Sequence, residues 1–99
     1  MALKEIMTAH QRLVILRLLG EVPGFDLNES ILQDGLDAYG LDISRDGLRT
    51  QLAWLVEQGM INLNKVGGTQ KAVLTSRGED VSQGRAVVPG IKRPRAGES

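Results

Sequence analysis

The stretch "SRDGLRTQLAWLVEQGMI", residues 44–61, contains the features of one helix with a defined beginning and end. Its leucines recur at intervals of four and then three residues, which is the spacing of the buried face of an α-helix. Ser44 is the expected N-cap, because its hydroxyl can accept a hydrogen bond from a free backbone N–H of the first turn. Gly59 is the expected stop, since glycine takes the left-handed conformation without steric cost. We therefore expect a helix from Ser44 to Gly59, with a positive φ at the glycine.

Two short strands joined by a glycine turn follow this helix. The segments "INLNKV" (61–66) and "TQKAVL" (69–74) flank Gly67-Gly68, a dipeptide suited to a two-residue hairpin turn. Pairing the strands across this turn places Leu63 opposite Ala72 and gathers apolar residues on one face. A slip of one residue would scatter them, so the pattern supports this register.

Two more helices are expected before this unit and one after it. Residues 3–20 show helical spacing, and a capping box that begins at Thr8 leaves open whether the helix starts at residue 3 or restarts there. A second helix is expected over 28–39, with at most a short extended piece before it. A second capping box at Ser76 opens a short helix that ends near Gly84.

The order helix, helix, helix, hairpin, short helix predicts a mainly α fold with a small β-hairpin, which is the winged helix-turn-helix layout. The length of 99 residues fits one domain, which we place at residues 1–84. Residues 85–99 form a basic C-terminal arm that contains proline and glycine and has little means of packing. We expect this arm to be extended or flexible.

The sequence also resembles known families. The stretch 44–78 is similar to the core of a winged helix-turn-helix domain of the ArsR/MarR type, which also joins its wing to the next helix through a segment like "LTSRGED" (74–80). The whole chain resembles a family of small proteins from Mu-like transposable phages and prophages. That resemblance rests on "HQRLVILRLLGEVPG", "SRDGLRTQLAWLVEQGMI", "LTSRGEDVSQGRA" and "VPGIKRP". It implies a winged-helix fold and, by analogy, a transcriptional regulator in the cytoplasm of a bacterial host.

Charge is unevenly distributed along a chain whose formal net charge is zero. Residues 21–42 hold six acidic residues and no basic one, whereas residues 44–77 hold five basic residues against two acidic ones. Residues 85–99 hold four basic residues against one acidic residue. Asymmetry of this kind favours a polyanion as partner, and double-stranded DNA fits the expected fold.

The third helix of a winged-helix domain lies in the major groove, with its N-terminal half nearest the base edges. The residues expected to contact DNA there are Ser44, Arg45, Arg49 and Thr50. Arginine is the commonest reader of guanine, because its planar fork matches two acceptors on one base. The alternative is that both arginines are solvated surface residues without a role in binding.

Further basic or polar residues lie near the hairpin tip and in the tail. They are Lys65, Gln70 and Lys71 in the hairpin, and Lys92, Arg93 and Arg95 in the tail. The hairpin residues are expected on neighbouring phosphates, although lysines there also protect an exposed strand from aggregation. The tail is expected in a minor groove or along phosphates, and the alternative is a basic terminus without function.

Two features favour a different class of function. The second helix carries Glu29, Asp34 and Asp37, and like-sign charges close to the phosphate backbone weaken binding. Trp54 lies off the centre of the apolar face, and tryptophan is enriched at interfaces. The alternative is that the first helix, or segment 87–91 folding back, covers Trp54 within the chain. The second hypothesis is therefore a phage protein–protein interaction or assembly module that keeps the fold without DNA binding.

Other classes of function lack the residues they need. The chain has no cysteine and one histidine, His10, so thiolate sites and histidine clusters for a metal are excluded. No nucleophile, base and orienting group recur in a pattern that indicates catalysis, so we expect neither an enzyme nor a cofactor. Apolar runs are too short for a bilayer, and the first residues do not resemble a secretory signal. We expect a homodimer formed through the first helix and the last segment.

Overall fold

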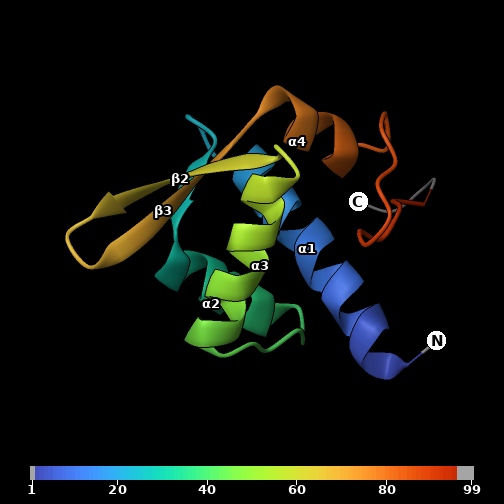
Figure 1. The fold of residues 1–99 in the computed structure, drawn as a ribbon, viewed down its shortest axis with the longest axis horizontal. Helices are drawn as coiled ribbons and strands as arrows, with labels where there is room; N and C mark the ends of the chain where they lie inside the picture. Colours follow the sequence, from blue (N-terminus) through green and yellow to red (C-terminus); the bar gives the residue numbers. More distant parts are fainter. Residues whose placement is uncertain (1, 96–99) are drawn as a thin grey trace.

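The computed structural model describes residues 2–95, and this part of the chain forms four helices and three strands (Figure 1). In chain order the elements are α1 (Leu3–Glu21), β1 (Asp26–Asn28), α2 (Glu29–Ala38), α3 (Arg45–Glu57), β2 (Ile61–Val66), β3 (Thr69–Leu74) and α4 (Ser76–Ser82). This order confirms the expected winged helix-turn-helix layout. Among the described residues no helix has the length and apolar character needed to cross a membrane.

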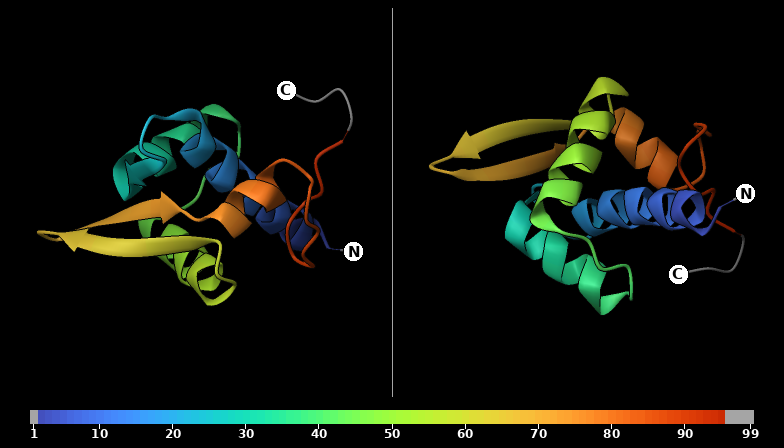
Figure 2. Two further views of the ribbon diagram at one scale, coloured as in Figure 1. Left: turned by 90° about the horizontal axis from the view of Figure 1, so that it is seen from above. Right: turned by 60° about the horizontal axis from the view of Figure 1, so that its bottom comes forward.

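The sheet has the strand order β1-β3-β2, and both pairings are antiparallel. The hairpin has the expected register, with Leu63 opposite Ala72 and Ile61 opposite Leu74. The short extended piece before α2 pairs as a third strand, which places Leu27 opposite Ala72 on the other edge of β3. The hairpin projects from the body as a wing, at the end opposite the first turns of α1 in both views of Figure 2.

The helix boundaries show which local signals decide them. Gly59 has φ 76°, as expected at the end of α3, and the Ser44 hydroxyl accepts a hydrogen bond from Gly47 N at 2.9 Å. The N-cap of α4 is Thr75 and not Ser76, because the Thr75 hydroxyl accepts from a backbone N–H of the first turn. The expected capping box at Ser76 is therefore wrong by one residue.

Helix α1 is continuous from Leu3, so a restart at Thr8 does not occur. Gln11, the acceptor residue of the expected capping box, is buried and points elsewhere. Its side-chain amide donates to the carbonyl oxygens of Leu41 and Asp42, at 3.2 and 3.3 Å. These bonds tie α1 to the loop between α2 and α3, because a buried amide must find acceptors in the fold.

The core lies between the three long helices and the inner face of the sheet. It is built mainly of leucine and isoleucine, as expected for a chain with three aromatic residues. The large apolar side chains that are fully buried are Ile15, Leu16, Leu19, Leu32, Leu36, Leu48, Leu52, Leu55, Met60 and Ile61. In Figure 2, α2 and α3 flank α1, so each leucine stripe reaches this common core.

Residues 85–95, called the strap below, form no helix or strand, but they pack on the body, which we did not expect of the arm. Val88 and Ile91 are each only 8% exposed and belong to the hydrophobic core cluster. The backbone N–H of Lys92 donates to the carbonyl of Ala9 in α1, at 3.1 Å. The two apolar side chains and this bond hold the strap on α1. The last four residues of the predicted arm lie outside the described part of the chain.

Gly78 gives a test of the contact between α4 and β2. A Cβ at this buried position would lie 2.2 Å from the carbonyl oxygen of Met60, and backbone there cannot move without disturbing the sheet. We expect Gly78→Ala to lower the free energy of unfolding by about 2–3 kcal/mol, in the range of overpacked sites. Gly68→Ala at the wing tip is the matched control, because a Cβ there meets no atom within 4 Å. Urea unfolding measures both, and equal stability of the two variants would contradict the close contact.

Candidate nucleic-acid interface

A buried carboxylate organises the surface on which the DNA-contacting arginines were expected. Glu29 is the first residue of α2, and its side chain is fully buried. Arg49 of α3 donates to both carboxylate oxygens, from Nε at 2.7 Å and from Nη2 at 2.8 Å. The backbone N–H of Gln70 in β3 donates to the same carboxylate at 2.9 Å. One side chain therefore joins α2, α3 and the wing.

Arg49 also contacts the wing tip directly. Its Nη2 donates to the carbonyl oxygen of Gly68 at 3.3 Å, so the guanidinium bridges α3 to the hairpin turn. Its Nη1 makes no hydrogen bond within residues 2–95, and the side chain as a whole is 42% exposed. Arginine carries five N–H donors in a fixed fork, so one edge can hold Glu29 while the other stays open to solvent.

Arg45 is held by the neighbouring helix in a similar way. Its Nε donates to the side-chain oxygen of Gln33 at 2.9 Å, and its Nη2 donates to the Ser30 hydroxyl at 3.0 Å. The Arg45 Nη1 lies 3.8 Å from the Glu29 carboxylate. With Asp46 in the first turn of α3, the two arginines face two carboxylates, so the charges at the N-terminal half of α3 balance.

The electrostatics of the cluster follow from these bonds. The hydrogen bond from Arg49 is the largest influence on Glu29 and lowers its pKa from 4.5 to about 2, although burial alone would raise it. The same bond raises the pKa of Arg49. Glu29 is therefore ionised at neutral pH and does not contribute to an exposed acidic surface. Its charge is balanced within the chain by Arg49.

The other expected contacts of α3 have local roles as well. The Ser44 hydroxyl caps the helix, and the Thr50 hydroxyl donates to the carbonyl oxygen of Asp46 at 3.2 Å. Thr50 and Ala53 are exposed, so the outer side of α3 carries small side chains. A helix surface of this kind can approach another molecule closely.

The three residues predicted to contact DNA from the wing differ in whether their side chains already have partners within the protein. Lys71 pairs with Asp26 of β1 at 3.2 Å, which ties the outer strand to the sheet. Gln70 is partly buried beside Glu29, and its side-chain oxygen is buried without a partner within residues 2–95. Lys65 is exposed and forms no ion pair in the described part of the chain. Of the three, Lys65 is the one free to meet a phosphate.

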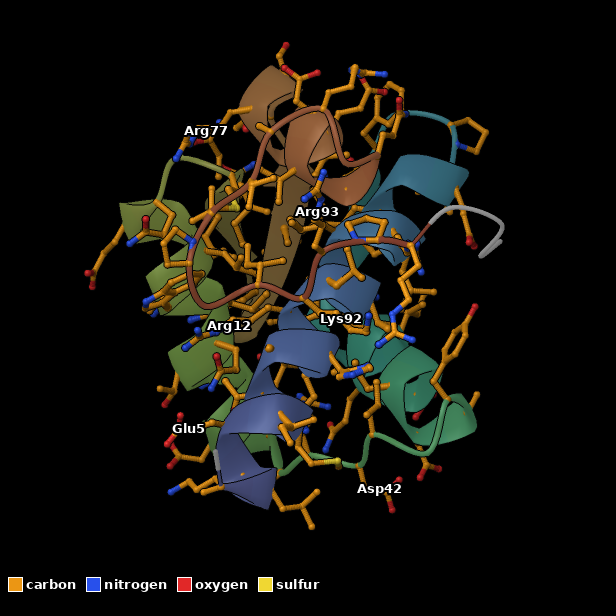
Figure 3. The ribbon with its side chains drawn as sticks, turned by 90° about the vertical axis from the view of Figure 1, so that its right-hand side faces the viewer. Glu5, Arg12, Asp42, Arg77, Lys92 and Arg93 are labelled. Atoms are coloured by element: carbon orange, nitrogen blue, oxygen red, sulfur yellow. The ribbon has the colours of Figure 1, made fainter. Side chains whose placement is uncertain are left out.

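The structure does not bring the tail cations to this surface. Lys92, Arg93 and Arg95 belong to the strap, at the end of the molecule opposite the wing (Figure 1). Figure 3 shows Lys92 and Arg93 on this opposite end, where the strap crosses α1. The predicted DNA-binding residues therefore form two separate groups. One comprises α3 and the wing, and the other comprises the strap.

Trp54, a candidate interface residue, is covered within the chain. The Arg12 guanidinium of α1 stacks over the indole ring, 3.8 Å from its centroid, and Gly90 of the strap lies against the other part of the ring. Arg12 donates to Gln51 at 2.7 Å and to the Gly90 carbonyl at 3.0 Å. Burial lowers the pKa of Arg12. This confirms the alternative in which α1 and the strap cover Trp54.

The acidic candidates lie at the far end of α2. Asp34 and Asp37 are exposed and line a hollow of about 240 Å³ together with Asp42. A hydrogen bond shared with Asp42 is the largest cause of a raised pKa at Asp37, and the charge of Asp42 adds to it. Within residues 2–95, no group of three or more histidine, cysteine, aspartate or glutamate side chains is placed to hold a metal ion.

Two functional residues were missed or misread at the sequence level. Glu29 was counted as surface acid, yet it precedes Leu32 and Leu36 by three and seven residues, which places it on the buried face of α2. That spacing was a usable signal. Arg12 was not singled out, and no local pattern in the sequence pairs it with Trp54, 42 positions later.

A three-helix body with a hairpin wing fastened to the third helix defines the winged-helix class of proteins. The chain superposes on RosR of H. salinarum with a TM-score of 0.63 and 23% identity, over 74% of this chain and 66% of that one. Two complex structures, of RosR-S4 and RosR-S1, match with TM-scores of 0.61 and 0.58 at 24% and 25% identity. These matches cover 74% and 71% of this chain, and 62% and 61% of theirs. The chain thus spans less than two thirds of the RosR chains, and the likeness supports the fold.

The chain belongs to the family of protein gp26 of Escherichia phage Mu. The two are 50% identical over 93 residues, which cover 94% of this chain and 96% of gp26. A protein of Haemophilus influenzae is 53% identical over 78 residues, which cover 78% of this chain and 76% of that protein. Both relatives are described as uncharacterized, and no protein-family model matches the chain. The expected relation to small proteins of Mu-like phages is confirmed.

The importance of the Glu29 carboxylate can be tested by substitution. Glu29→Gln removes the charge and leaves the Arg49 guanidinium without its counter-ion. Loss of a buried charged partner typically costs about 3–5 kcal/mol, but water solvates the half-exposed Arg49, so we expect a loss of about 2–3 kcal/mol. Glu57→Gln is the control, because Glu57 is exposed and forms no ion pair within residues 2–95. We call Glu29 and its bonds to Arg49 and Gln70 the Glu29 clamp. Equal unfolding free energies for the two variants would show that this clamp does not stabilise the fold.

The lowered pKa of Glu29 also predicts a pH dependence. Since the folded-state pKa of about 2 lies below the ordinary value of 4.5, the unfolded chain takes up this proton first. Glu29 therefore stabilises the fold above pH 4.5, and its contribution declines as the pH falls toward 2. We expect the urea midpoint of the wild type to drop over this window more steeply than that of Glu29→Gln. Parallel curves would rule out a lowered pKa at Glu29.

Proposed function

We propose that the chain is a DNA-binding protein of a Mu-like phage or prophage and that it regulates transcription. In this role the N-terminal half of α3 enters the major groove and the wing rests on neighbouring phosphates. The protein acts by binding and not by catalysis, and it works as a dimer on two half-sites. The observation that carries the proposal is the Glu29 clamp, which presents two arginines beside a fixed wing.

The clamp favours binding because it fixes the arginines before any partner arrives. A free arginine loses much of its rotamer freedom when it contacts a base, which reduces the gain from the contact. Arg49 already has a fixed position between Glu29 and Gly68, with Nη1 directed away from both. The ordering cost is therefore met in the free protein, and the open edge of the guanidinium can donate hydrogen bonds to acceptor atoms of DNA.

The charges around α3 are compatible with this role. Asp46 lies in the first turn, where the helix dipole favours an anion, and Glu57 lies at the last residue of the helix. The stretch between them, which would lie deepest in the groove, carries no acidic side chain. The exposed acids of α2 also lie toward the end of that helix distant from Glu29.

A second candidate function rests on the surface at the end of α2. Ile31 and Tyr39 are 51% and 60% exposed, and Asp34, Asp37 and Asp42 lie on the same helix or directly after it. Apolar side chains beside acids that form no ion pair within residues 2–95 suit a basic protein partner better than a polyanion. This supports an assembly module that keeps the winged-helix fold without binding DNA.

Ala53 gives a test of the outer side of α3, where it is exposed. Ala53→Glu adds a negative charge where the groove would be, one helical turn after Arg49, so the new carboxylate can also compete with DNA for the open edge of that guanidinium. We expect the affinity for duplex DNA to fall at least about tenfold, because a carboxylate close to phosphates is repelled. Ala38→Glu, the same change at the exposed end of α2, is the matched control and should bind like the wild type. Fluorescence polarisation with phage DNA at two salt concentrations measures the three affinities.

The outcomes separate the two candidate functions. Loss of affinity in Ala53→Glu alone supports α3 as the reading helix. Equal affinity of both variants and the wild type would exclude α3 from the interface. If the wild type binds no duplex at low salt more tightly than a neutral control protein does, the regulator proposal is wrong and the assembly module takes its place.

A further inference from the structure

The end of the molecule opposite the wing is formed by the first half of α1 and the strap (Figure 3). A groove of about 450 Å³ lies between these two segments. The apolar part of its lining consists of Ile6, Ala9 and Ile91, and the charged part consists of Glu5 and Lys92. The groove is fixed in shape, since the Lys92 N–H bonds to the Ala9 carbonyl beside it.

The first turns of α1 expose large apolar side chains at this end: Ile6 lines the groove, and Leu3 lines a neighbouring hollow between α1 and α3. Leu3 is 72% exposed and Ile6 is 40% exposed. They lie three residues apart and so share one face of the helix. Covering such side chains stabilises an interface by about 25 cal/mol for each Å² of apolar surface removed from water.

Several charged side chains at this end form no ion pair in the described part of the chain. Near the wing, Arg45, Arg49 and Lys71 pair with acidic side chains, and at the start of the strap Arg85 pairs with Asp80. In the described part of the chain, no ion pair involves Lys92, Arg93 and Arg95 of the strap. Glu5, on the same end, is equally without one in residues 2–95. Basic and acidic groups thus face solvent together on one surface.

The arrangement of these charges is visible in Figure 3. Glu5 and Asp42 lie toward the lower edge of the view, whereas Lys92 and Arg93 lie above them on the strap. A two-fold axis that lies in the plane of this surface, between the acidic edge and the strap, would therefore set the acidic edge of one copy against the strap of the other. A surface that complements itself under rotation by half a turn is the property of an isologous dimer interface.

We propose that this end binds a second copy of the chain. In the dimer, Leu3 and Ile6 of each protomer enter the groove region of the other, and Glu5 faces the partner's Lys92. The body measures 28 by 24 Å across its long axis, and a standard stable interface takes roughly 800 Å² from each partner. The pairing must therefore cover nearly the whole of this end.

The pairing leaves α3 and the wing free. The wing lies at the opposite end of the long axis, so two wings would point outward from the dimer (Figure 1). The dimer would supply two reading helices for two half-sites, and this role rests on the proposed function. The pairing itself requires no DNA and can be measured without it.

The test is the mass of the full chain by sedimentation equilibrium over a range of protein concentrations, without DNA. Ile6→Glu places a charge in the apolar contact, and we expect it to raise the dimer dissociation constant at least about tenfold. Val66→Glu is the matched control, because Val66 is 64% exposed but lies at the wing tip. It should leave the dissociation constant unchanged. Circular dichroism confirms that each variant is folded.

Charge reversal tests the orientation of the two copies. Glu5→Lys and Lys92→Glu each place like charges opposite one another in their own dimers, so each should self-associate less than the wild type. Mixing the two variants restores opposite charges at both contacts, and we expect heterodimers to form as tightly as the wild-type dimer. High salt should weaken the wild-type dimer and the rescued heterodimer alike.

The outcomes decide the proposal independently of DNA binding. A wild-type chain that stays monomeric at all concentrations overturns it, and so does a dimer that Ile6→Glu leaves intact. A dimer disrupted by Ile6→Glu but not restored by mixing the reversed variants overturns the two-fold arrangement. Dimers that behave as expected while no duplex is bound would leave this surface standing and remove the proposed function.

Discussion

The bidentate pair between Glu29 and Arg49 is the interaction on which the shape of the molecule depends. A hairpin wing has no core of its own, and an isolated hairpin is at best marginally stable. Here the N–H of Gln70 and the carbonyl of Gly68 are both bonded to the pair, so the wing is held from α2 and α3 together. Burying a carboxylate is costly unless its oxygens are filled by donors, and three N–H groups fill them.

The same pair constrains how α3 can bind another molecule. Arginines that reach a partner from a flexible surface can change rotamer to follow it, whereas Arg49 cannot leave Glu29 without exposing a buried carboxylate. Its position is thus set by the fold, and a partner must fit the guanidinium where it lies. A surface of this kind distinguishes partners by the positions of their acceptor atoms, because an acceptor displaced from the open edge of the guanidinium forms only a weak hydrogen bond.

Much of the fold could be predicted because its signals are local. Gly59 ends α3, and the alternating pattern around Gly67-Gly68 sets the hairpin register, each within a few residues. The strap could not be predicted in this way. Val88 and Ile91 have no periodic apolar pattern around them, and their burial depends on a groove made by α1, far away in the sequence.

The candidate site shows the same division. The positions of Arg45 and Arg49 on α3 follow from helical spacing, but their partners do not, since Glu29 lies 20 residues before Arg49 and on another helix. The sequence shows that Glu29 is acidic, but it does not show directly that the carboxylate is a buried partner of Arg49. An acidic residue that lies three and seven positions before buried leucines, as Glu29 does before Leu32 and Leu36, is better interpreted as a buried ion-pair partner than as a surface charge.

A net charge of zero conceals two ends of different character. Near the wing, Glu29 pairs with two arginines and Asp26 pairs with Lys71. At the strap, Arg85 pairs with Asp80, but Lys92, Arg93 and Arg95 form no ion pair within residues 2–95, and apolar side chains of α1 lie at the same end. Matched charges fix the relative positions of helices and strands inside one molecule. Charged side chains without an ion pair, next to exposed apolar side chains, suit contact with a second molecule. Water solvates such a charge well, so a partner must supply both an opposite charge and apolar surface to replace that water. The chain therefore uses its ion pairs at one end to build the winged helix, and keeps the other end able to join a further surface.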